Sequence, residues 1–396
     1  MLTNSITEAV PFVVFGDDWA SHVTIAHHIV RLLAKTNRVL YVNGIGTRSP
    51  RWNVYDLRRA LAKFRQWVSP KGHRAEAELP NLEVFSPFVV PFNSVSAVRR
   101  CNQRMLRRSV GRLLKTRSFE APILLVAHPL GAEVVGAIGE RLLIYLVMDE
   151  YQEMPGVDRN YLCALERILL ARADLIFATS TKLQEQKSGK KAQTFFLPHG
   201  VDFEHFRTVQ GCLVPEEMKD LPRPLLGMYG TLAPWVDSDL LVQVARAFPQ
   251  ASVVLIGTRT DVPLPENVPN LHWLGARRYA ELPRYAAHFD VGLIPFRRNE
   301  LTTYVNPLKL LEYLALGLPV VSTPLPDVSR FAEHVYIGES TGDFILKVRL
   351  ALDDKATARR EQRVALAARE NWETRLQTVL QHVEKALDRR VAACVK

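Results

Sequence analysis

Short apolar runs alternate with helical patterns along most of the chain. Residues 12–15 and 39–42 are two such runs, and a helical pattern over 22–35 lies between them. A run this short is typical of a buried strand, so the three segments predict one β-α-β unit. The alternation continues to residue 197 and predicts a doubly wound parallel sheet. Further strands are expected at 82–85, 123–127, 142–148, 175–178 and 194–197, and helices at 97–117, near 131–139 and up to 172.

A second series of strands and helices begins at residue 225. The segment before it, residues 209–224, contains three prolines and no periodicity, which predicts a linker between two domains. Strands are expected at 225–229, 253–256, 291–294 and 320–321, and helices at 240–248, 283–289 and across 343–392. We therefore expect an N-terminal domain over 1–208, a C-terminal domain over 225–370, and a last helix over 371–396 that packs back on the first domain.

Residues 306–323, NPLKLLEYLALGLPVVST, carry the most informative pattern of the second series. The proline near its start and the Gly-Leu-Pro at its end delimit a helix, and the valines that follow predict a short strand. Lys309 and Glu312 lie in the first two turns, where free N–H groups and the helix dipole favour an anion. Lys309 adds a positive charge and Glu312 can accept hydrogen bonds from a diol, which would suit a phosphorylated sugar or a nucleotide. The alternative is an ordinary amphipathic helix with both side chains in solvent.

Length and composition indicate a globular protein of two domains. A chain of 396 residues is too long for one ordinary core, and 47% of it is hydrophobic and 23% charged. No apolar run approaches the ~20 residues that span a bilayer, and no basic residue precedes the first apolar stretch as in a secretory signal. The four cysteines are scattered without metal-ligand spacing, so we expect a cytoplasmic setting with neither a disulfide nor a zinc site.

The net charge of +10 is concentrated in two segments. Residues 51–74 hold seven Lys and Arg against one acid, and residues 97–117 hold eight and no acid. Two basic amphipathic helices suggest an anionic partner: a membrane surface or, less favoured, nucleic acid. Aromatic residues interleaved with the first segment favour the membrane, so peripheral attachment to the inner face of the cell membrane is expected. The alternative is a solvated basic face.

Residues 271–328 resemble the donor half of retaining glycosyltransferases of family 4 type. They are most similar to the branch of teichuronic-acid and exopolysaccharide glycosyltransferases. Three further segments resemble motifs of these enzymes: 197–206 the "NGVDxxxF" segment, 146–156 the "DxY…PG" segment, and 371–373 the "SW" of the final helix. The resemblance covers most of residues 120–390 and is strongest over 271–328.

This resemblance implies the GT-B fold, in which two Rossmann-like domains face an interdomain cleft and a helical tail follows. It also implies a retaining transfer of sugar from a nucleotide-sugar donor, with UDP or GDP as the nucleotide, to a lipid-linked or polysaccharide acceptor. Such enzymes act in cell-surface polysaccharide biosynthesis without a divalent metal or other cofactor. The departing diphosphate would be stabilised by a helix N-terminus and Lys or Arg side chains.

Glu312 resembles the second glutamate of the E-x7-E motif, which in the family holds the ribose hydroxyls. The first glutamate would fall at Tyr304, so this chain lacks it and its contacts to the sugar must differ. Asn306, with the hydroxyls of Thr302 and Thr303, is a nearby replacement.

The phosphate loop of the family corresponds to Gly230 and Thr231, but its usual Lys or Arg is missing here. We expect the phosphate charge to be met by Lys309, Arg297 or Arg298. The alternative for the two arginines is a solvated loop. The remaining donor-binding residues are expected at the ends of neighbouring strands, at Gly257, Thr258, Leu274 and Gly275.

In addition to Lys309, two residues are expected to be catalytic: His128 and Asp149, each at the end of a strand of the first domain. Family members carry a histidine near the transferred sugar, although His128 could instead be structural. Asp149 or its neighbour Glu150 could orient the acceptor hydroxyl or cap a helix. Gly16 and Asp17 lie where GT-B enzymes keep a glycine loop near the acceptor. No metal ligands are expected.

Three other functions remain open at this stage. A nucleotide-sugar 2-epimerase shares the GT-B fold, but its acid–base set cannot be assembled from this sequence. A partner subunit that binds nucleotide-sugar without turnover would fit the missing glutamate and the missing basic residue of the phosphate loop. A nucleic-acid binder fits least, since no recognition motif accompanies the charge.

Overall fold

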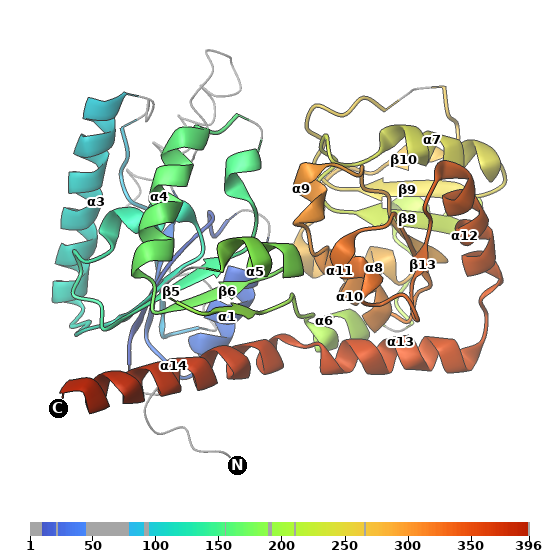
Figure 1. The fold of residues 1–396 in the computed structure, drawn as a ribbon. Helices are drawn as coiled ribbons and strands as arrows, with labels where there is room; N and C mark the ends of the chain where they lie inside the picture. Colours follow the sequence, from blue (N-terminus) through green and yellow to red (C-terminus); the bar gives the residue numbers. More distant parts are fainter. Residues whose placement is uncertain are drawn as a thin grey trace. The chain divides into compact units, whose positions relative to one another are not determined.

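The computed structural model describes residues 10–20, 23–44, 79–90, 95–154, 156–188, 192–209, 211–264 and 267–394. The chain divides into two compact units (Figure 1). Unit 1 comprises Met1–Thr179, Leu183–Leu197 and Leu376–Lys396, and unit 2 comprises Ser180–Lys182 and Pro198–Arg375. The long stretch of unit 2 therefore begins at Pro198, ahead of the predicted linker at 209–224. The basic segment predicted at 51–74 lies outside the described residues.

Unit 1 is built on a parallel sheet of seven strands. The strand order is β3-β2-β1-β4-β5-β6-β7, with Phe12 opposite Val39 on one side and Ile123 on the other. Most of these strands are buried on both faces, which explains why they are continuous apolar runs in the sequence. Their bounds are β1 Phe12–Gly16, β2 Val39–Asn43, β3 Leu82–Phe85, β4 Ile123–Val126, β5 Leu142–Val147, β6 Leu175–Ala178 and β7 Thr194–Phe196.

Helices cover this sheet or follow its strands. They are α1 Ile25–Leu33, α3 Ser96–Thr116, α4 Arg159–Arg172 and α5 Thr181–Lys187, with short 3-10 helices η1 Pro129–Val134 and η2 Tyr151–Glu153. The basic helix predicted at 97–117 is confirmed as α3. The helix predicted near 131–139 is wrong, because only η1 forms there. Gly136 and Gly139 both adopt positive φ, at 74° and 70°, which ends helical conformation.

Unit 2 is built on a second parallel sheet, of six strands in the order β10-β9-β8-β11-β12-β13. The order reverses between β8 and β11, and ligands of open α/β sheets bind at such a switch point. The strands are β8 Leu225–Tyr229, β9 Ser252–Ile256, β10 Leu271–Trp273, β11 Val291–Ile294, β12 Val320–Ser322 and β13 Tyr336–Ile337. The other elements are α6 Phe203–Arg207, η3 Glu216–Met218, α7 Ser238–Ala247, η4 Tyr279–Glu281, α8 Leu282–Ala286, α9 Glu300–Thr303, α10 Leu308–Ala315 and α11 Pro326–Ser329.

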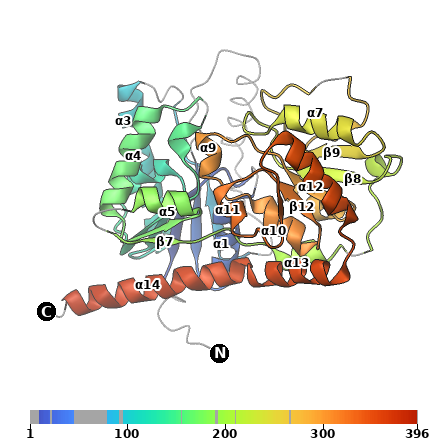
Figure 2. The same ribbon diagram turned by 45° about the vertical axis from the view of Figure 1, so that its right-hand side comes forward.

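The chain ends in three helices, as the pattern over 343–392 predicts. These are α12 Thr341–Asp353, α13 Thr357–Arg369 and α14 Trp372–Cys394, the last drawn as one long ribbon in Figure 2. Trp372 begins α14 and is almost fully buried. Near the other end of α14, Arg390 forms an ion pair with Asp174 of unit 1. None of the described helices is both long enough and apolar enough to cross a membrane. Two Rossmann-like sheets and a helical tail confirm the predicted fold class.

Candidate functional site

Helix α10 is fixed tightly against the centre of the unit 2 sheet. Tyr313 packs over Gly292 of β11, where an added Cβ would lie only 2.6 Å from the tyrosine Cδ2. The hydroxyl of Tyr313 also accepts a hydrogen bond of 3.2 Å from the backbone N–H of Tyr229, the last residue of β8. These contacts hold α10 against β11 and at the carboxyl end of β8.

Gly230 and Gly257, which follow β8 and β9, allow the backbones at the ends of these strands to lie very close together. Gly230 has φ of +116° and Gly257 has φ of +147°, values that L side chains rarely adopt. A Cβ on Gly257 would lie 1.9 Å from the carbonyl oxygen of Gly230. The backbone of the loop after β8 can therefore come close to the loop after β9, and to a ligand, because no side chain lies between them.

Lys309 supplies a cation to this loop. Its Nζ would lie 3.0 Å from a Cβ placed on Gly230, and it lies 4.8 Å from the ring centroid of Phe296. The residue is only 9% exposed. Burial lowers the pKa of Lys309 to about 8, although the nearby Glu312 acts in the opposite direction. The loop after β8 has no basic residue of its own, and Lys309 of α10 places a positive charge next to it. Lys309 is one of the three basic residues that the sequence suggested for this place.

Glu312 lies one turn further along α10 and is also buried. The hydroxyl of Tyr229 donates a hydrogen bond of 2.7 Å to its Oε2. Burial raises the pKa of Glu312 to about 7, while hydrogen bonds from Tyr229 and Tyr279 and the charge of Lys309 lower it. Neither tyrosine was predicted as a site residue, since neither lies in a motif. The position of Tyr229 at the end of a strand is the one sequence signal that points to it. The ribose contact of Glu312 stays a prediction.

The other predicted donor residues surround the same loop through their backbones. The N–H of Gly257 donates to the carbonyl of Gly275 at 2.9 Å, and the carbonyl of Thr258 accepts from Leu232 at 2.8 Å. Leu274 donates to Leu255 of β9 at 2.9 Å. Thr231 and Asn306 are half-buried, on the loop after β8 and just before α10. Tyr304, at the place of the missing carboxylate, is buried.

The two arginines considered as alternatives to Lys309 are engaged elsewhere. Arg297 contacts Asp239 at 3.0 Å and Asp237 at 3.6 Å. Arg298 lies 3.7 Å from Glu339, with both side chains exposed. Of the three cations, Lys309 is therefore the one whose charged atom we place at the Gly230 loop.

A second polar cluster lies in unit 1, at the carboxyl ends of β1, β4 and β5. His128 follows β4 as a buried residue, and its Nδ1 accepts a hydrogen bond of 3.3 Å from the N–H of Leu130. Its ring lies 4.8 Å from that of Tyr151, and it lines a small cavity together with Gly16. The charge of Asp17 acts on the pKa of both His128 and Asp149, so both residues lie within electrostatic range of Asp17.

The electrostatics of this cluster suit proton transfer. Burial, together with the charges of Asp17 and Glu150, raises the pKa of Asp149 to about 7. Burial lowers the pKa of His128, against the opposite effect of Asp17. A carboxyl group with a pKa near neutrality can accept a proton from a hydroxyl and return it. Glu150, the other candidate for this role, is instead paired with Lys187. The part of the chain that the structure describes contains no cluster of three or more metal-ligating side chains.

Comparison with known proteins agrees with this geometry. The family described as "Glycosyl transferases group 1" matches residues 223–354, which include β8 to α12. Over 238 residues the chain is 26% identical to the Bacillus subtilis (strain 168) protein TuaH, provisionally named a teichuronic acid biosynthesis glycosyltransferase. That match covers 57% of this chain and 60% of TuaH, so the similarity spans less than two thirds of the relative.

Solved structures with the same fold cover nearly the whole chain. Sucrose-phosphate synthase (tll1590) of Thermosynechococcus elongatus has a TM-score of 0.68 at 15% identity, covering 97% of this chain and 100% of its own. Anabaena Alr3699/HepE in complex with UDP has a TM-score of 0.63 at 13% identity, covering 95% and 100%. At this level of identity the neighbours show the fold alone. The family match and TuaH support a transferase.

Proposed function

We propose that this chain, whose residues 223–354 form a group 1 glycosyltransferase domain, transfers a sugar from a nucleotide-sugar to a saccharide or lipid-linked acceptor. UDP is the nucleotide we favour, because the HepE structure of the same fold holds UDP. The relative TuaH suggests that the reaction belongs to the biosynthesis of a cell-surface polysaccharide.

One observation carries the proposal: the buried ammonium of Lys309 beside the bare backbone of Gly230, at the switch point of the sheet. A cation near the N-terminus of a helix at this position suits a diphosphate. The cation is held by α10 and cannot move far into solvent, so it is preorganised for charge that develops on the leaving group.

We further propose that the transfer proceeds with retention and without a divalent metal. Lys309 and the N-terminus of α10 would then stabilise the departing diphosphate. Asp149 and His128 would serve the acceptor, with Asp149 orienting its hydroxyl and His128 close to the transferred sugar. Glu312 would hold the ribose hydroxyls, and the backbone around Gly275 would contact the base.

Calorimetric titration with UDP, and with GDP for comparison, tests the proposed donor. We expect UDP to bind with a dissociation constant in the micromolar to millimolar range that is usual for enzyme substrates. Lys309→Met and Glu312→Ala should both weaken this binding while the protein stays folded. If neither nucleotide binds the wild-type protein, the proposal is refuted.

The affinity for UDP should fall as the pH rises from 7 to 9.5. The pKa of Lys309 in the free protein is about 8, so above this pH the ammonium loses the proton that attracts the diphosphate. Ionisation of Glu312, with a pKa of about 7, adds a negative charge nearby and acts in the same direction. Once Lys309 is mostly neutral, the loss approaches about tenfold per pH unit. An affinity that stays constant over this range would contradict the role of Lys309.

Helix α3 offers a surface for the proposed membrane contact. Its buried residues Asn102, Leu106, Val110 and Leu114 define one face. At ~100° per residue, the exposed Arg100, Arg104, Arg108, Arg112 and Lys115 fall on the opposite face. This stripe runs for about 22 Å along the helix. Its charge would be attracted to the anionic lipids of the inner leaflet, which would place the acceptor-side unit at the membrane.

Replacing Arg104, Arg108 and Arg112 by glutamine should weaken binding to vesicles that contain phosphatidylglycerol. Each basic residue near an anionic surface contributes ~1 kcal/mol, so the loss should be at least about tenfold at low salt. Vesicle flotation measures it. The matched control removes three exposed charges from unit 2, at Arg246, Lys355 and Arg369, and should change little. Equal losses for both triple variants would show that net charge, not α3, determines binding.

A further inference from the structure

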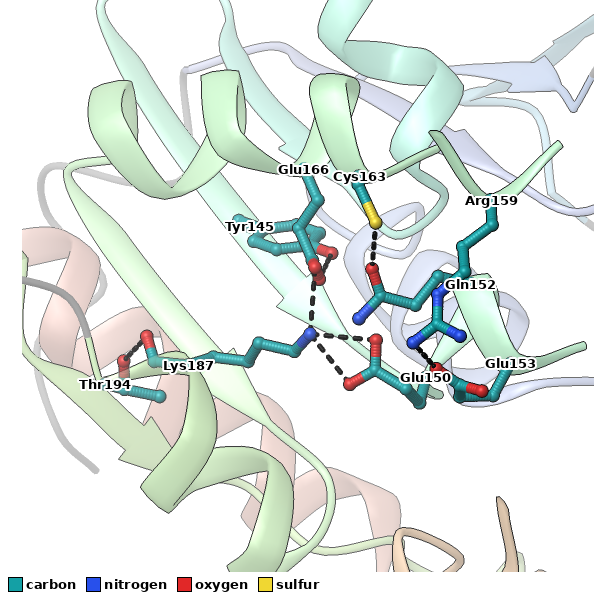
Figure 3. Close-up of polar contacts among 9 residues, drawn as sticks. All are labelled: Tyr145, Glu150, Gln152, Glu153, Arg159, Cys163, Glu166, Lys187 and Thr194. Carbon is teal, nitrogen blue, oxygen red and sulfur yellow. Dashed lines mark hydrogen bonds and ion pairs between the residues drawn. The ribbon is translucent and has the colours of Figure 1, made fainter. Parts of the chain in front are cut away.

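A buried ion-pair network of unit 1 is drawn in Figure 3. One of its members, Glu150, follows Asp149 in the chain, and Asp149 belongs with Gly16, Asp17 and His128 to what we call the acceptor-side cluster. Lys187, at the end of α5, is only 4% exposed, and its Nζ lies 2.7 Å from Glu150 Oε2 and 2.8 Å from Glu166 Oε2. The hydroxyl of Tyr145 on β5 donates to Glu166 Oε1 at 2.9 Å. Figure 3 shows the carboxylates of Glu150 and Glu166 reaching the same lysine nitrogen from different elements.

The network is joined to the candidate catalytic residues by one short turn. Glu150 directly follows Asp149, and its carbonyl accepts from the N–H of Glu153 at 3.0 Å. Between them lies Tyr151, whose hydroxyl donates to the carbonyl of Ala127 at 3.3 Å and whose ring contacts that of His128. Residues 149–153, the β5 turn, therefore carry both Asp149 and Tyr151 and the Lys187 partner Glu150.

Burying three ionised groups is not an efficient way to stabilise a core. The desolvation of each charge offsets most of the attraction, and an apolar cluster of similar volume is often at least as stable. Such a network favours a single geometry, because moving one carboxylate would leave the buried lysine charged and without one of its partners. Glu150 is held in this way, and with it the direction in which the β5 turn leaves the strand.

We propose that Lys187 and Glu166 are positioning residues that hold the β5 turn so that Asp149 stays beside Asp17 and His128. This inference rests on the proposed function, since it assigns the cluster to the acceptor side of a transfer reaction. Neither residue touches the cluster itself; both act through Glu150.

Two variants test the proposal without leaving a buried charge alone. In Lys187→Met/Glu150→Gln/Glu166→Gln all three charges are replaced by neutral side chains of similar size, so the core stays filled while the geometric constraint is lost. In Glu166→Gln alone, the amide oxygen can still accept from Lys187, and near wild-type behaviour should be retained. Hydrogen exchange of the amides of residues 150–154 is measured first, since it needs no substrate.

We expect the triple variant to exchange these amides at least about tenfold faster, with the protection of the β5 amides unchanged. Two controls separate positioning from general destabilisation. Arg159→Ala removes the exposed Arg159–Glu153 ion pair on the same turn, which contributes little, and should leave exchange unchanged. Leu169→Ala lowers the stability of unit 1 through a cavity in α4 and should also leave the turn unchanged.

Turnover then shows whether the geometry matters for chemistry. With UDP-glucose as the probe and water in place of the acceptor, kcat for UDP release should fall about tenfold to a hundredfold in the triple variant. KM for UDP-glucose should not change, because Lys187 belongs to unit 1 and the proposed donor residues belong to unit 2. Wild-type exchange and wild-type kcat in a less stable triple variant would show that the network is only structural.

If the wild-type protein does not bind UDP, the proposed function has failed, and the exchange result still decides whether the network holds the turn.

Discussion

Replacing Lys309 by methionine is expected to lower kcat/KM for the nucleotide-sugar by about two to three orders of magnitude, the usual effect of removing one preorganised electrostatic group. Methionine has a similar length and volume, so the space between Gly230 and Phe296 stays filled. The change removes only the charge that faces the loop after β8. Steady-state release of UDP from UDP-glucose measures the effect, with UDP affinity from calorimetry beside it.

The same variant should be as stable as the wild-type protein or more stable. The pKa of Lys309 is lowered from its ordinary value of 10.5 to about 8, so the folded state binds the proton less tightly than the unfolded chain. Below pH 8 the lysine is charged in both states, and its burial then lowers the free energy of unfolding by about 3 kcal/mol, at 1.36 kcal/mol per pKa unit. Replacing it by methionine removes this penalty. A higher melting temperature at pH 7 together with lost activity would mark Lys309 as a functional residue.

Lys347 on α12 provides the matched control. It is a partly exposed lysine of the same unit that contacts Asp343 at 3.9 Å, an ion pair expected to contribute little. Lys347→Met should change neither turnover nor the melting temperature measurably. If Lys309→Met keeps wild-type turnover, the diphosphate is stabilised by another group and the assignment of the donor site is wrong.

The sheets were predictable because their strands are buried on both faces and so remain continuous apolar runs. The segment after β4 was not, because the helical spacing near 131–139 is overridden by glycines with positive φ. Local periodicity cannot detect a backbone conformation that the tertiary fold imposes. The bounds of α10 were predictable because two local signals coincide: the apolar face of the helix stops where the Gly-Leu-Pro sequence begins to prevent helix formation.

The positions of Lys309 and Glu312 on one helix were predictable, but their environment was not. The spacing of Lys309 and Glu312 places them on neighbouring turns of one helix, yet Lys and Glu are usually exposed. Their burial depends on Tyr229, which is 83 residues before Glu312, and on Tyr313, which packs over a glycine of another strand. Likewise, nothing in the sequence separates Asp149 from Glu150. Their roles differ because Lys187 pairs with one of them and Asp17 acts on the other.

Replacing Gly257 by alanine is expected to abolish UDP binding and to destabilise unit 2. A φ of +147° lies in a region that is nearly restricted to glycine, and holding another residue there costs ~1–3 kcal/mol. The new Cβ would also lie 1.9 Å from the carbonyl oxygen of Gly230, a separation that requires the backbone of one loop to move. Either displacement shifts Gly230 relative to Lys309, so binding should be lost even at temperatures where the variant is folded.

Gly342 on α12 is the matched control for this substitution. A Cβ there would meet nothing within 4 Å, and its φ is not in the positive range. Because alanine favours a helix over glycine by roughly 0.5–1 kcal/mol, Gly342→Ala should raise the melting temperature slightly and leave UDP affinity unchanged. Thermal unfolding measures the stability of the two variants, and calorimetry measures their affinity for UDP. The two variants carry the same added methyl group, once in α12 and once in the loop after β9. If Gly257→Ala binds UDP as the wild-type protein does, the close approach of the two glycines has no part in holding the donor, and the phosphate loop must be sought elsewhere in unit 2.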